Sequence, residues 1–420
     1  MLNWMSGVTS SRGVAGQKAT VLALDQSGAL GGAELSLLEI CKRSEGRFEV
    51  VLFTDGLFRE RLSDAGVAVR VLQQPAFQAM RASGGESMSL KALVGGLKLI
   101  WNVAKLARSR RVVYANTQKA MVIGAFAGLI AGRPVVWHLR DIVSLEHFGK
   151  SRLFVIKWIT KLFVSHVIAN SEASASALRT LAKLHVGKIS VVYNGIDSAS
   201  FDVAATVPAA KLRARYQLPE NAFLIGCFSR LAHWKGQHVL LQALESIPNA
   251  HGVIVGSALF GEDEYAQLLQ LQADVPALRG RVHFLGFQAD VASLMVAMDV
   301  VVHTSIAPEP FGRVIVEAML ARRPIVASRA GGALEIITHA VDGLLVEPDN
   351  SAALASAINN LRATPDLNKA IVSQGYIRAK DFFGPVAYCM SVMGKLEKIG
   401  GIKVSTVPVL ASVARPPFER

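Results

Sequence analysis

The sequence predicts an α/β protein built from two Rossmann-like, doubly wound domains that face each other across a cleft. The chain has 420 residues, more than one ordinary hydrophobic core organises, so two domains are expected. Short apolar runs alternate with stretches of helical periodicity, which is the pattern of a parallel sheet covered by helices. An apolar content of 51% and 35 glycines agree with buried parallel strands and exclude a disordered or fibrous protein.

The elements of the first domain follow one another at short intervals from residue 20 onward. Each expected strand precedes a stretch in which apolar residues recur at helical spacing. The expected strands are residues 20–26, 48–54, 67–72, 111–116, 134–139, 166–171 and 189–194. We therefore place a leader at residues 1–18 and an N-terminal domain at residues 19–200.

A second series of strands begins after residues 198–218, where the strand rhythm is lost. Its expected strands are residues 223–229, 252–257, 281–286, 300–305, 324–329 and 343–348. This series places a second domain at residues 201–383. In doubly wound sheets, ligands bind outside the carboxyl ends of the strands, so the polar residues that follow each strand are the candidates for a site.

Charge and cysteine content narrow the class of partner and the compartment. Lys and Arg outnumber Asp and Glu by 25 to 13 in residues 1–200 and by 20 to 19 in residues 201–420. The first domain should therefore face a membrane surface, a phosphorylated lipid or a nucleic acid. Three scattered cysteines fit neither a disulfide framework nor a zinc site and favour a reducing cytoplasm. The first 20 residues lack a secretory pattern, and the longest apolar runs fall short of the ~20 residues of a membrane-spanning helix.

The segment PEPFGRVIVEAML, residues 308–320, carries two glutamates eight residues apart. The prolines on either side place Glu309 in a loop, whereas the apolar spacing places Glu317 in a helix that begins near Phe311 and Gly312. The first amides of that helix would have no partner within it, so this junction is a candidate anion site between two acids. The alternative is that both glutamates are solvated surface groups.

Two further segments contain residues suited to bind phosphate groups. Arg230 and Lys235 follow an expected strand and precede a helix, where they could clamp a diphosphate or could be ordinary solvated cations. Gly28, Gly31 and Gly32 follow the first strand, ahead of a helix that starts near residues 33–34, and permit either a tight turn or a phosphate loop. They do not form the dinucleotide fingerprint G-x-G-x-x-G.

Other strand ends add weaker candidates. Phe287 could meet a nucleobase or could be an ordinary core aromatic. His138, Arg140 and Asp141 end an apolar strand and are expected to face the interdomain cleft, although a lone histidine is more often structural. Asn194 offers a turn at the end of the first domain.

Taken in order, GGAE, WHLRD, VVYNGID, Arg230 with Lys235, LGF, and Glu309 with Glu317 resemble the motifs of the family 4 glycosyltransferases, which have the GT-B fold. The resemblance covers the chain from about Thr20 to Ile399. It implies retaining, metal-independent transfer from a nucleotide-diphosphate sugar, bound mainly by the second domain, to an acceptor bound mainly by the first. It also implies that a helix at residues 384–400 returns to the first domain, which leaves residues 401–420 as a tail.

The resemblance assigns a role to each candidate residue. Glu317 would hold the ribose hydroxyls, Glu309 the hydroxyls of the donor sugar, and the amides near 311–313 the diphosphate. Arg230 and Lys235 would neutralise the charge that grows on the leaving diphosphate, and His138 would lie near the reacting sugar. The donor-side residues are Gly31, Gly32, Phe287, Phe311, Gly312, Arg313 and Glu317, and the acceptor-side residues are Arg140 and Asp141. No cofactor or metal is expected, and no D-x-D motif occurs.

Two basic segments bear on the acceptor. Lys91, Lys98 and Lys105 recur at intervals of seven, and Lys150, Lys157 and Lys161 accompany Phe154, Trp158 and Phe163. This pattern is typical of interfacial helices on anionic lipid, although ordinary amphipathic helices show it too. We expect a cytoplasmic enzyme, peripheral on the inner face of the membrane, that extends a lipid-linked or lipopolysaccharide-type glycan. The alternatives are a nucleotide-sugar epimerase of the same architecture and a basic nucleic-acid-binding protein, although no nucleic-acid partner is expected.

Overall fold

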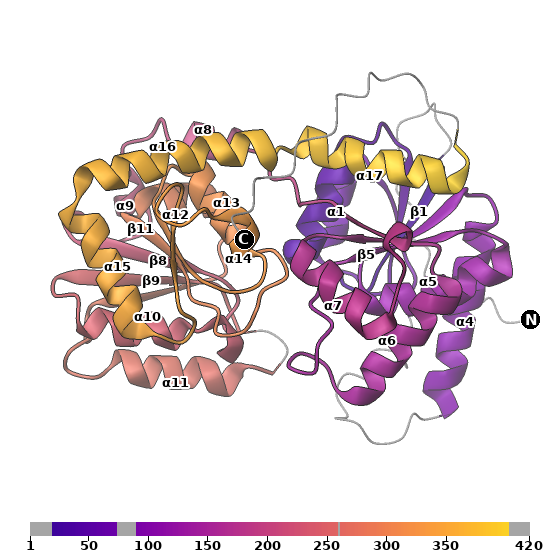
Figure 1. The fold of residues 1–420 in the computed structure, drawn as a ribbon, viewed down its shortest axis with the longest axis horizontal. Coiled ribbons are helices and arrows are strands. Elements are labelled where there is room, and N and C mark those ends of the chain that lie inside the picture. The colour runs from indigo at the N-terminus through magenta and orange to yellow at the C-terminus, as the bar shows by residue number, and fades with distance from the viewer. Residues whose placement is uncertain (1–18, 74–89, 259–260, 403–420) are drawn as a thin grey trace, which may run out of the picture. The chain divides into compact units, whose positions relative to one another are not determined.

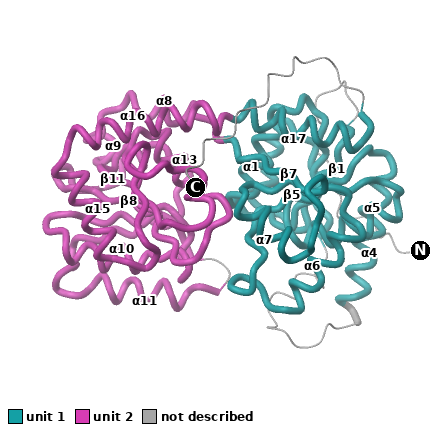
Figure 2. The backbone as a smooth tube through the Cα atoms, in the orientation of Figure 1, with its two compact units in different colours: residues 1–195, 385–411 teal, residues 196–384, 412–420 magenta. Residues whose placement is uncertain are grey.

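A computed structural model of the chain describes residues 19–73, 90–258 and 261–402 (Figure 1). The predicted leader, residues 1–18, and the tail beyond residue 402 lie outside the described residues. The chain divides into two compact units (Figure 2). Unit 1 runs to Gly195 and resumes at Pro385, and unit 2 runs from Ile196 to Gly384. The predicted boundaries were between residues 200 and 201 and between residues 383 and 384. Beside both boundaries, the Ile196 amide donates to the Phe383 carbonyl at 2.9 Å, which joins the two ends of unit 2.

Unit 1 contains a parallel sheet of seven strands in the order β3-β2-β1-β4-β5-β6-β7. All seven predicted strands are present. They are β1 (Val21–Asp25), β2 (Phe48–Leu52), β3 (Ala68–Val71), β4 (Val112–Ala115), β5 (Val135–Leu139), β6 (His166–Ala169) and β7 (Ile189–Val191). Alternate residues of β1 enter different cores: Leu22 and Leu24 pack on one face of the sheet, and Val21 and Ala23 on the other. Burial on both faces explains the continuous apolar runs of these strands.

The helices of unit 1 cover these two faces. They are α1 (Gly32–Lys42), α2 (Leu57–Asp64), α4 (Leu90–Ala107), α5 (Gln118–Ala131), α6 (Lys150–Phe163), α7 (Glu172–Ala182), η1 (Val186–Lys188) and α17 (Pro385–Gly400). The core on one face contains side chains of α4, α5, α6 and α7, and the core on the other face contains side chains of α1, α2 and α17. The last described helix thus belongs to the first sheet. None of the described helices combines the length and the apolar character needed to span a membrane.

Unit 2 repeats the architecture with a parallel sheet of six strands, ordered β10-β9-β8-β11-β12-β13. All six predicted strands are present: β8 (Phe223–Phe228), β9 (Ala250–Val255), β10 (Val282–Gly286), β11 (Val300–His303), β12 (Ile325–Ser328) and β13 (Leu344–Val346). The accompanying helices are α8 (Ala199–Ala204), α9 (Ala209–Arg215), η2 (His233–Lys235), α10 (Gln237–Glu245), α11 (Asp263–Ala273), α12 (Val291–Ala297), α13 (Arg313–Leu320), α14 (Ala333–Ile336), α15 (Ser351–Ala363) and α16 (Pro365–Phe382).

The strand order of each sheet reverses at a central pair, β1 with β4 in unit 1 and β8 with β11 in unit 2. Such a reversal opens a crevice at the carboxyl ends of the two strands, where α/β proteins bind ligands. In unit 2, the segments that leave this point approach closely at Gly236, which has φ +67°. A Cβ atom on Gly236 would lie 2.0 Å from the Thr304 carbonyl oxygen. Only glycine fits both the backbone conformation and the space.

Gly236→Ala should therefore destabilise unit 2 more than an alanine at another left-handed glycine. Gly280, at φ +77°, has nothing within 4 Å of a built Cβ and is the matched control. We expect Gly280→Ala to cost about 1–2 kcal/mol for the left-handed backbone alone, and Gly236→Ala to cost a further ~1–3 kcal/mol because Thr304 must move. Urea unfolding of the unit 2 transition measures both. Equal losses in the two variants would contradict the close approach.

Candidate active site

The segments that follow β8 and β11 are bound to each other at the switch point of unit 2. The Ile306 amide donates to the Trp234 carbonyl at 2.9 Å, and the Thr304 hydroxyl donates to the Lys235 carbonyl at 2.9 Å. The buried Gln237 holds the segment that follows β8. Its Nε2 donates to the Ser229 hydroxyl and to the Arg230 carbonyl, both at 2.8 Å. These contacts set the position of Lys235 relative to the loop after β11.

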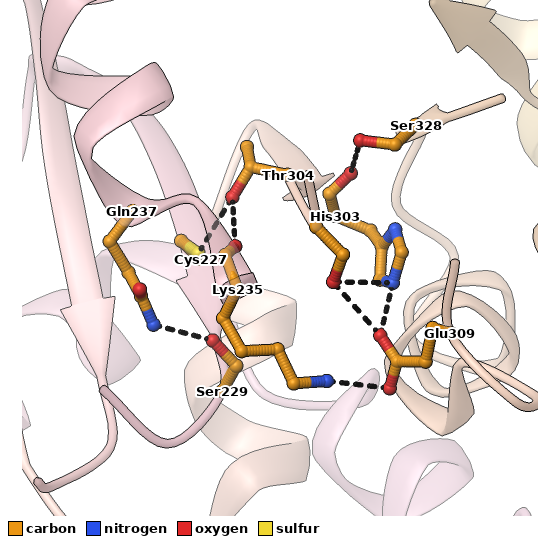
Figure 3. A network of polar contacts seen from close by, with 9 residues as sticks. Cys227, Ser229, Lys235, Gln237, His303, Thr304, Glu309 and Ser328 are labelled. Atoms are coloured by element: carbon orange, nitrogen blue, oxygen red, sulfur yellow. Dashed lines mark hydrogen bonds and ion pairs between the residues drawn. The ribbon is translucent and has the colours of Figure 1, made fainter. Parts of the chain in front are cut away.

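The centre of the site is the carboxylate of Glu309, each of whose oxygens has its own donors (Figure 3). Lys235 Nζ donates to Oε1 at 2.6 Å. His303 Nε2 and the Ser305 hydroxyl donate to Oε2 at 2.5 Å and 3.0 Å. Burial alone would raise the pKa of Glu309, but Lys235 and His303 outweigh burial and hold the pKa well below its usual range. Glu309 is therefore an anion that accepts hydrogen bonds throughout the physiological pH range.

The backbone of Glu309 is held as firmly as its side chain. The Gly332 amide donates to the Glu309 carbonyl at 2.8 Å. A Cβ atom on Gly331, which has φ +57°, would lie 2.3 Å from the same oxygen, so this approach requires glycine. Neither glycine was singled out from the sequence. The signal available was the pair Gly331–Gly332 directly after an expected strand.

The predicted loop-to-helix junction is confirmed. Glu309 precedes α13 in a loop, α13 begins at Arg313 with Gly312 as its N-cap, and Glu317 lies in the second turn. Gly312 adopts φ +90°, and no side chain caps the helix. The first amides of α13 therefore have no capping side chain and favour an anion. Arg313 lies 3.2 Å from Glu317 as an ion pair between neighbouring turns.

Two other predicted donor-side residues also lie at strand ends in unit 2. Arg230 follows β8, and its guanidinium lies 5.6 Å from the centre of the Trp234 ring. Lys235 Nζ lies 4.2 Å from the same centre, so both cations lie near the Trp234 ring. Phe287 follows β10 with 57% of its surface exposed, which excludes the alternative of an ordinary core aromatic.

The residues predicted to face the cleft from β5 are placed differently from that expectation. His138 is completely buried, with its ring 5.7 Å from that of Tyr114 and 6.2 Å from that of Tyr388 on α17. Burial, followed by the charge of Arg140, lowers the pKa of His138 well below its ordinary value. The role of His138 beside the reacting sugar stays a prediction, and in unit 1 the ring packs between two tyrosines. We assign it to the packing of α17 against the sheet.

Arg140 is also a structural residue rather than an open acceptor contact. Its guanidinium donates to Asn116 Oδ1 and Asn194 Oδ1, both at 2.8 Å, and to the Tyr388 hydroxyl at 3.1 Å. These partners occupy the planar fork that an acceptor would need. The carboxylate of Asp141 lies 3.3 Å from Gln118 Nε2, which donates to it. Sequence reasoning placed these residues at the right edge of the sheet but could not foresee their partners.

The glycine-rich segment after β1 is filled by the chain's own groups. The Gly28 amide donates to the Thr54 hydroxyl at 2.7 Å, and a Cβ atom on Gly28 would lie 2.3 Å from the Asp55 carbonyl. Gly31 is the N-cap of α1, where a Cβ atom would lie 2.7 Å from a carboxylate oxygen of Glu34. The buried carboxyl of Glu34 thus occupies the start of α1. The tight-turn alternative fits Gly28. Gly31 is half-buried and Gly32 is exposed, and their donor-side role stays a prediction.

Burial changes the acidity of the two carboxyls in this segment. Burial, and then the negative charge of Asp25, raise the pKa of Glu34 to about 8. Burial raises the pKa of Asp25 to about 6, although Asn116 Nδ2 donates to it at 2.6 Å. Within the described residues, no group of three or more His, Cys, Asp or Glu is arranged to hold a metal ion.

The chain matches two family models that meet near the boundary between the units. Residues 30–200 match Glycosyltransferase Family 4, and residues 209–378 match Glycosyl transferases group 1. Among solved structures, Anabaena HepE in complex with UDP and glucose is 41% identical, with a TM-score of 0.81 over 90% of this chain and 100% of that one. WaaG, a glycosyltransferase involved in lipopolysaccharide biosynthesis, is 16% identical with a TM-score of 0.66 over 91% and 100%, which shows a shared fold.

Curated relatives include two bacterial glycosyltransferases of surface polysaccharides. LpsD of Rhizobium meliloti, a lipopolysaccharide core biosynthesis glycosyltransferase, is 34% identical over 177 residues, which cover 42% of this chain and 50% of that protein. CapM of Staphylococcus aureus, a capsular polysaccharide biosynthesis glycosyltransferase, is 26% identical over 310 residues, or 70% and 78%. The chain spans about half the length of the first curated relatives it matches.

The raised pKa of Glu34 predicts how stability depends on pH. An acid that binds its proton more tightly when folded loses stabilising free energy as pH rises from its ordinary pKa of 4.5 to about 8. Glu34→Gln, which stays neutral, should flatten the fall in the unfolding free energy of unit 1 between pH 6 and 8 by roughly 2–3 kcal/mol. Glu60→Gln, at an exposed position of α2, is the control. An unchanged slope in Glu34→Gln would show that Glu34 ionises normally.

Proposed function

The chain belongs to the family 4 glycosyltransferases, and on this premise we propose that it transfers a sugar from a nucleotide-diphosphate sugar to a glycan acceptor, with retention at the anomeric carbon. The observation that carries the proposal is the meeting of Glu309, Lys235 and the uncapped start of α13 at the switch point of unit 2. A cation, an anion and a helix start without a capping side chain, all in one crevice, match a ligand with a phosphate part and a hydroxylated part.

The phosphate part of the donor is assigned to the cations and to the helix start. The anomeric carbon–oxygen bond breaks in the transfer, and negative charge grows on the departing diphosphate. Lys235, Arg230 and the amides that begin α13 stabilise this charge in place of a metal ion, which is the largest single contribution in many enzymes. The acceptor oxygen bonds to the anomeric carbon from the same face, and its proton passes to the departing phosphate oxygen.

The hydroxylated parts of the donor are assigned to the two glutamates. Glu309 accepts from hydroxyls of the transferred sugar, and Glu317 accepts from the ribose hydroxyls. An anion with a strongly lowered pKa cannot donate a proton, so Glu309 serves as an acceptor of hydrogen bonds rather than as a general acid. The UDP and glucose bound to Anabaena HepE favour a UDP-sugar as the donor to test first.

The acceptor is proposed to be a lipid-linked or lipopolysaccharide-type glycan at the inner face of the membrane. The names of the curated relatives LpsD and CapM support this class of product. Unit 1 adds a surface, the interfacial patch, formed by the outer faces of three neighbouring helices. Its large apolar side chains are 41–64% exposed: Leu93, Leu97 and Trp101 of α4, Leu129 and Ile130 of α5, and Phe154, Trp158 and Leu162 of α6.

Cations surround the aromatic residues of the interfacial patch. Lys105 Nζ and the Arg108 guanidinium lie 5.9 and 5.6 Å from the ring centre of Trp101. Lys157 and Lys161 lie 5.9 and 5.5 Å from that of Trp158. Exposed indole rings flanked by Lys and Arg suit the boundary between lipid headgroups and acyl chains of an anionic membrane. The side chain of Lys91, which was predicted to join this set, lies outside the described residues.

A panel of nucleotide-diphosphate sugars tests the donor site. We expect one donor to raise the melting temperature of the wild type, because a ligand at 100 times its dissociation constant adds about 2.7 kcal/mol to stability. Glu317→Ala and Lys235→Ala should abolish this shift. Glu264→Ala and Lys369→Ala, at exposed positions of the same unit, are matched controls that should keep it. No shift with any donor at millimolar concentration, with or without a glycan acceptor, would remove the proposal. Turnover of the donor without change of mass would instead indicate an epimerase.

Sedimentation with vesicles of anionic and zwitterionic phospholipid tests the interfacial patch. The wild type should bind anionic vesicles at low salt, and Trp101→Ala combined with Trp158→Ala should weaken binding about tenfold or more, because each ring leaves water on binding. Leu268→Ala combined with Leu271→Ala removes two exposed leucines of α11 in unit 2 and is the matched control. A wild-type protein that stays in the supernatant at low salt would contradict membrane association but not sugar transfer.

A further inference from the structure

We propose that His303 is a positioning residue that keeps the Glu309 carboxylate in place while Lys235 exchanges from Glu309 to the diphosphate of the donor. The inference rests on the proposed function of this site. It concerns a residue that the sequence pattern did not single out: His303 is the last residue of β11 and is 5% exposed. Its side chain acts through Glu309.

The first step of the argument is that the donors of Glu309 are divided between its two oxygens. Among the contacts described here, Lys235 donates to Oε1 and His303 donates to Oε2 (Figure 3). The Ser305 hydroxyl also donates to Oε2. Removing Lys235 leaves both hydrogen bonds to Oε2 in place. His303 and Ser305 are buried at the end of a central strand, whereas Lys235 extends a long unbranched side chain from a short 3₁₀ turn of another segment. One oxygen is therefore anchored, and the other has an exchangeable partner.

The second step concerns which nitrogen of His303 carries a proton. An ionised carboxylate only accepts hydrogen bonds, so Nε2 must be the donor in its contact with Glu309. A donor to a charged acceptor forms a stronger hydrogen bond than a neutral pair. His303 Nδ1 is buried and has no hydrogen-bond partner. The site thus uses a single N–H group of His303, in one position.

The third step connects this anchor to the anion site at the start of α13. Nε2 of His303 lies 3.8 Å from the position of a Cβ atom on Gly312, the N-cap of α13. The carboxylate and the proposed diphosphate position are therefore neighbours, and Lys235 can serve either. When the diphosphate takes Lys235, Oε1 gains room for a hydroxyl of the donor sugar. When a nucleoside diphosphate without a sugar binds, Lys235 moves to the diphosphate, and no sugar hydroxyl replaces it at Oε1.

The positioning role predicts a selective loss of affinity. Without the Nε2 donor, Glu309 is poorly placed to meet the sugar once Lys235 leaves, whereas the contacts to the nucleotide and the diphosphate do not depend on it. His303→Leu should therefore weaken UDP-glucose binding about 10- to 100-fold, the range expected for losing a hydrogen bond to a charged group, and change UDP binding less than about threefold. His303→Gln offers an N–H near the Nε2 position and should restore most of the loss.

Isothermal titration of UDP and UDP-glucose against the full chain measures these affinities, with another UDP-sugar in its place if the donor panel selects one. His251→Leu, a histidine on β9 hydrogen-bonded to His283, is the matched control and should leave the ratio of the two affinities unchanged. Ser305→Ala should give a smaller, same-sign change because His303 remains. Equal losses for UDP and UDP-glucose in His303→Leu, or a His303→Gln variant that behaves like His303→Leu, would overturn the proposal.

A crystal structure separates failure of this inference from failure of the proposed function. If the wild type binds no nucleotide sugar, the proposed function fails. The ligand-free structures of the wild type and of His303→Leu then decide whether His303 positions Glu309. We expect the Glu309 carboxylate of the variant to move away from its wild-type position beside Ser305. A carboxylate in the wild-type position would overturn the role of His303.

Discussion

The site of unit 2 depends on the close approach of the segments that follow β8 and β11. Gly236 allows it, because no side chain fits between that residue and the Thr304 carbonyl. The hydrogen bonds from Ile306 and Thr304 to carbonyls of the first segment then hold the two together. At this separation Lys235 contacts Glu309 across the switch point at 2.6 Å. The parallel sheet creates the crevice, but the glycine contact sets its width.

The same electrostatic requirement produces different results in the two units. A buried charge is stable only where donors or acceptors replace water. Arg140 of unit 1 meets this requirement with two asparagines and a tyrosine, all fixed, and so binds α17 to the sheet. Glu309 of unit 2 has two fixed donors and one flexible cation. A group that can give up one partner without losing its place suits ligand exchange.

The cationic side chains of residues 1–200 have two different kinds of neighbour. Some of the arginines neutralise buried or half-buried acids, as Arg70 and Arg110 do for Glu49. Several lysines, such as Lys105, Lys157 and Lys161, lie against exposed tryptophan rings on the outer faces of α4 and α6. The net charge by itself does not distinguish the two uses. The combination with exposed aromatic side chains is what directs the surface toward lipid.

The sequence by itself determined the fold class, the thirteen strands found in the described residues and the junction between Glu309 and α13, because local periodicity and proline or glycine positions report on local backbone structure. Only the tertiary structure decided what the polar side chains contact. His138 and Arg140 were predicted at the right strand end, yet α17, about 250 residues further along the chain, buries the histidine and occupies the arginine. His303 was not singled out either: the role proposed for it depends on the loop turn that brings Glu309 back to it and on Lys235, which is 74 residues from Glu309 in the chain. Partners that are distant in sequence leave no trace in local spacing.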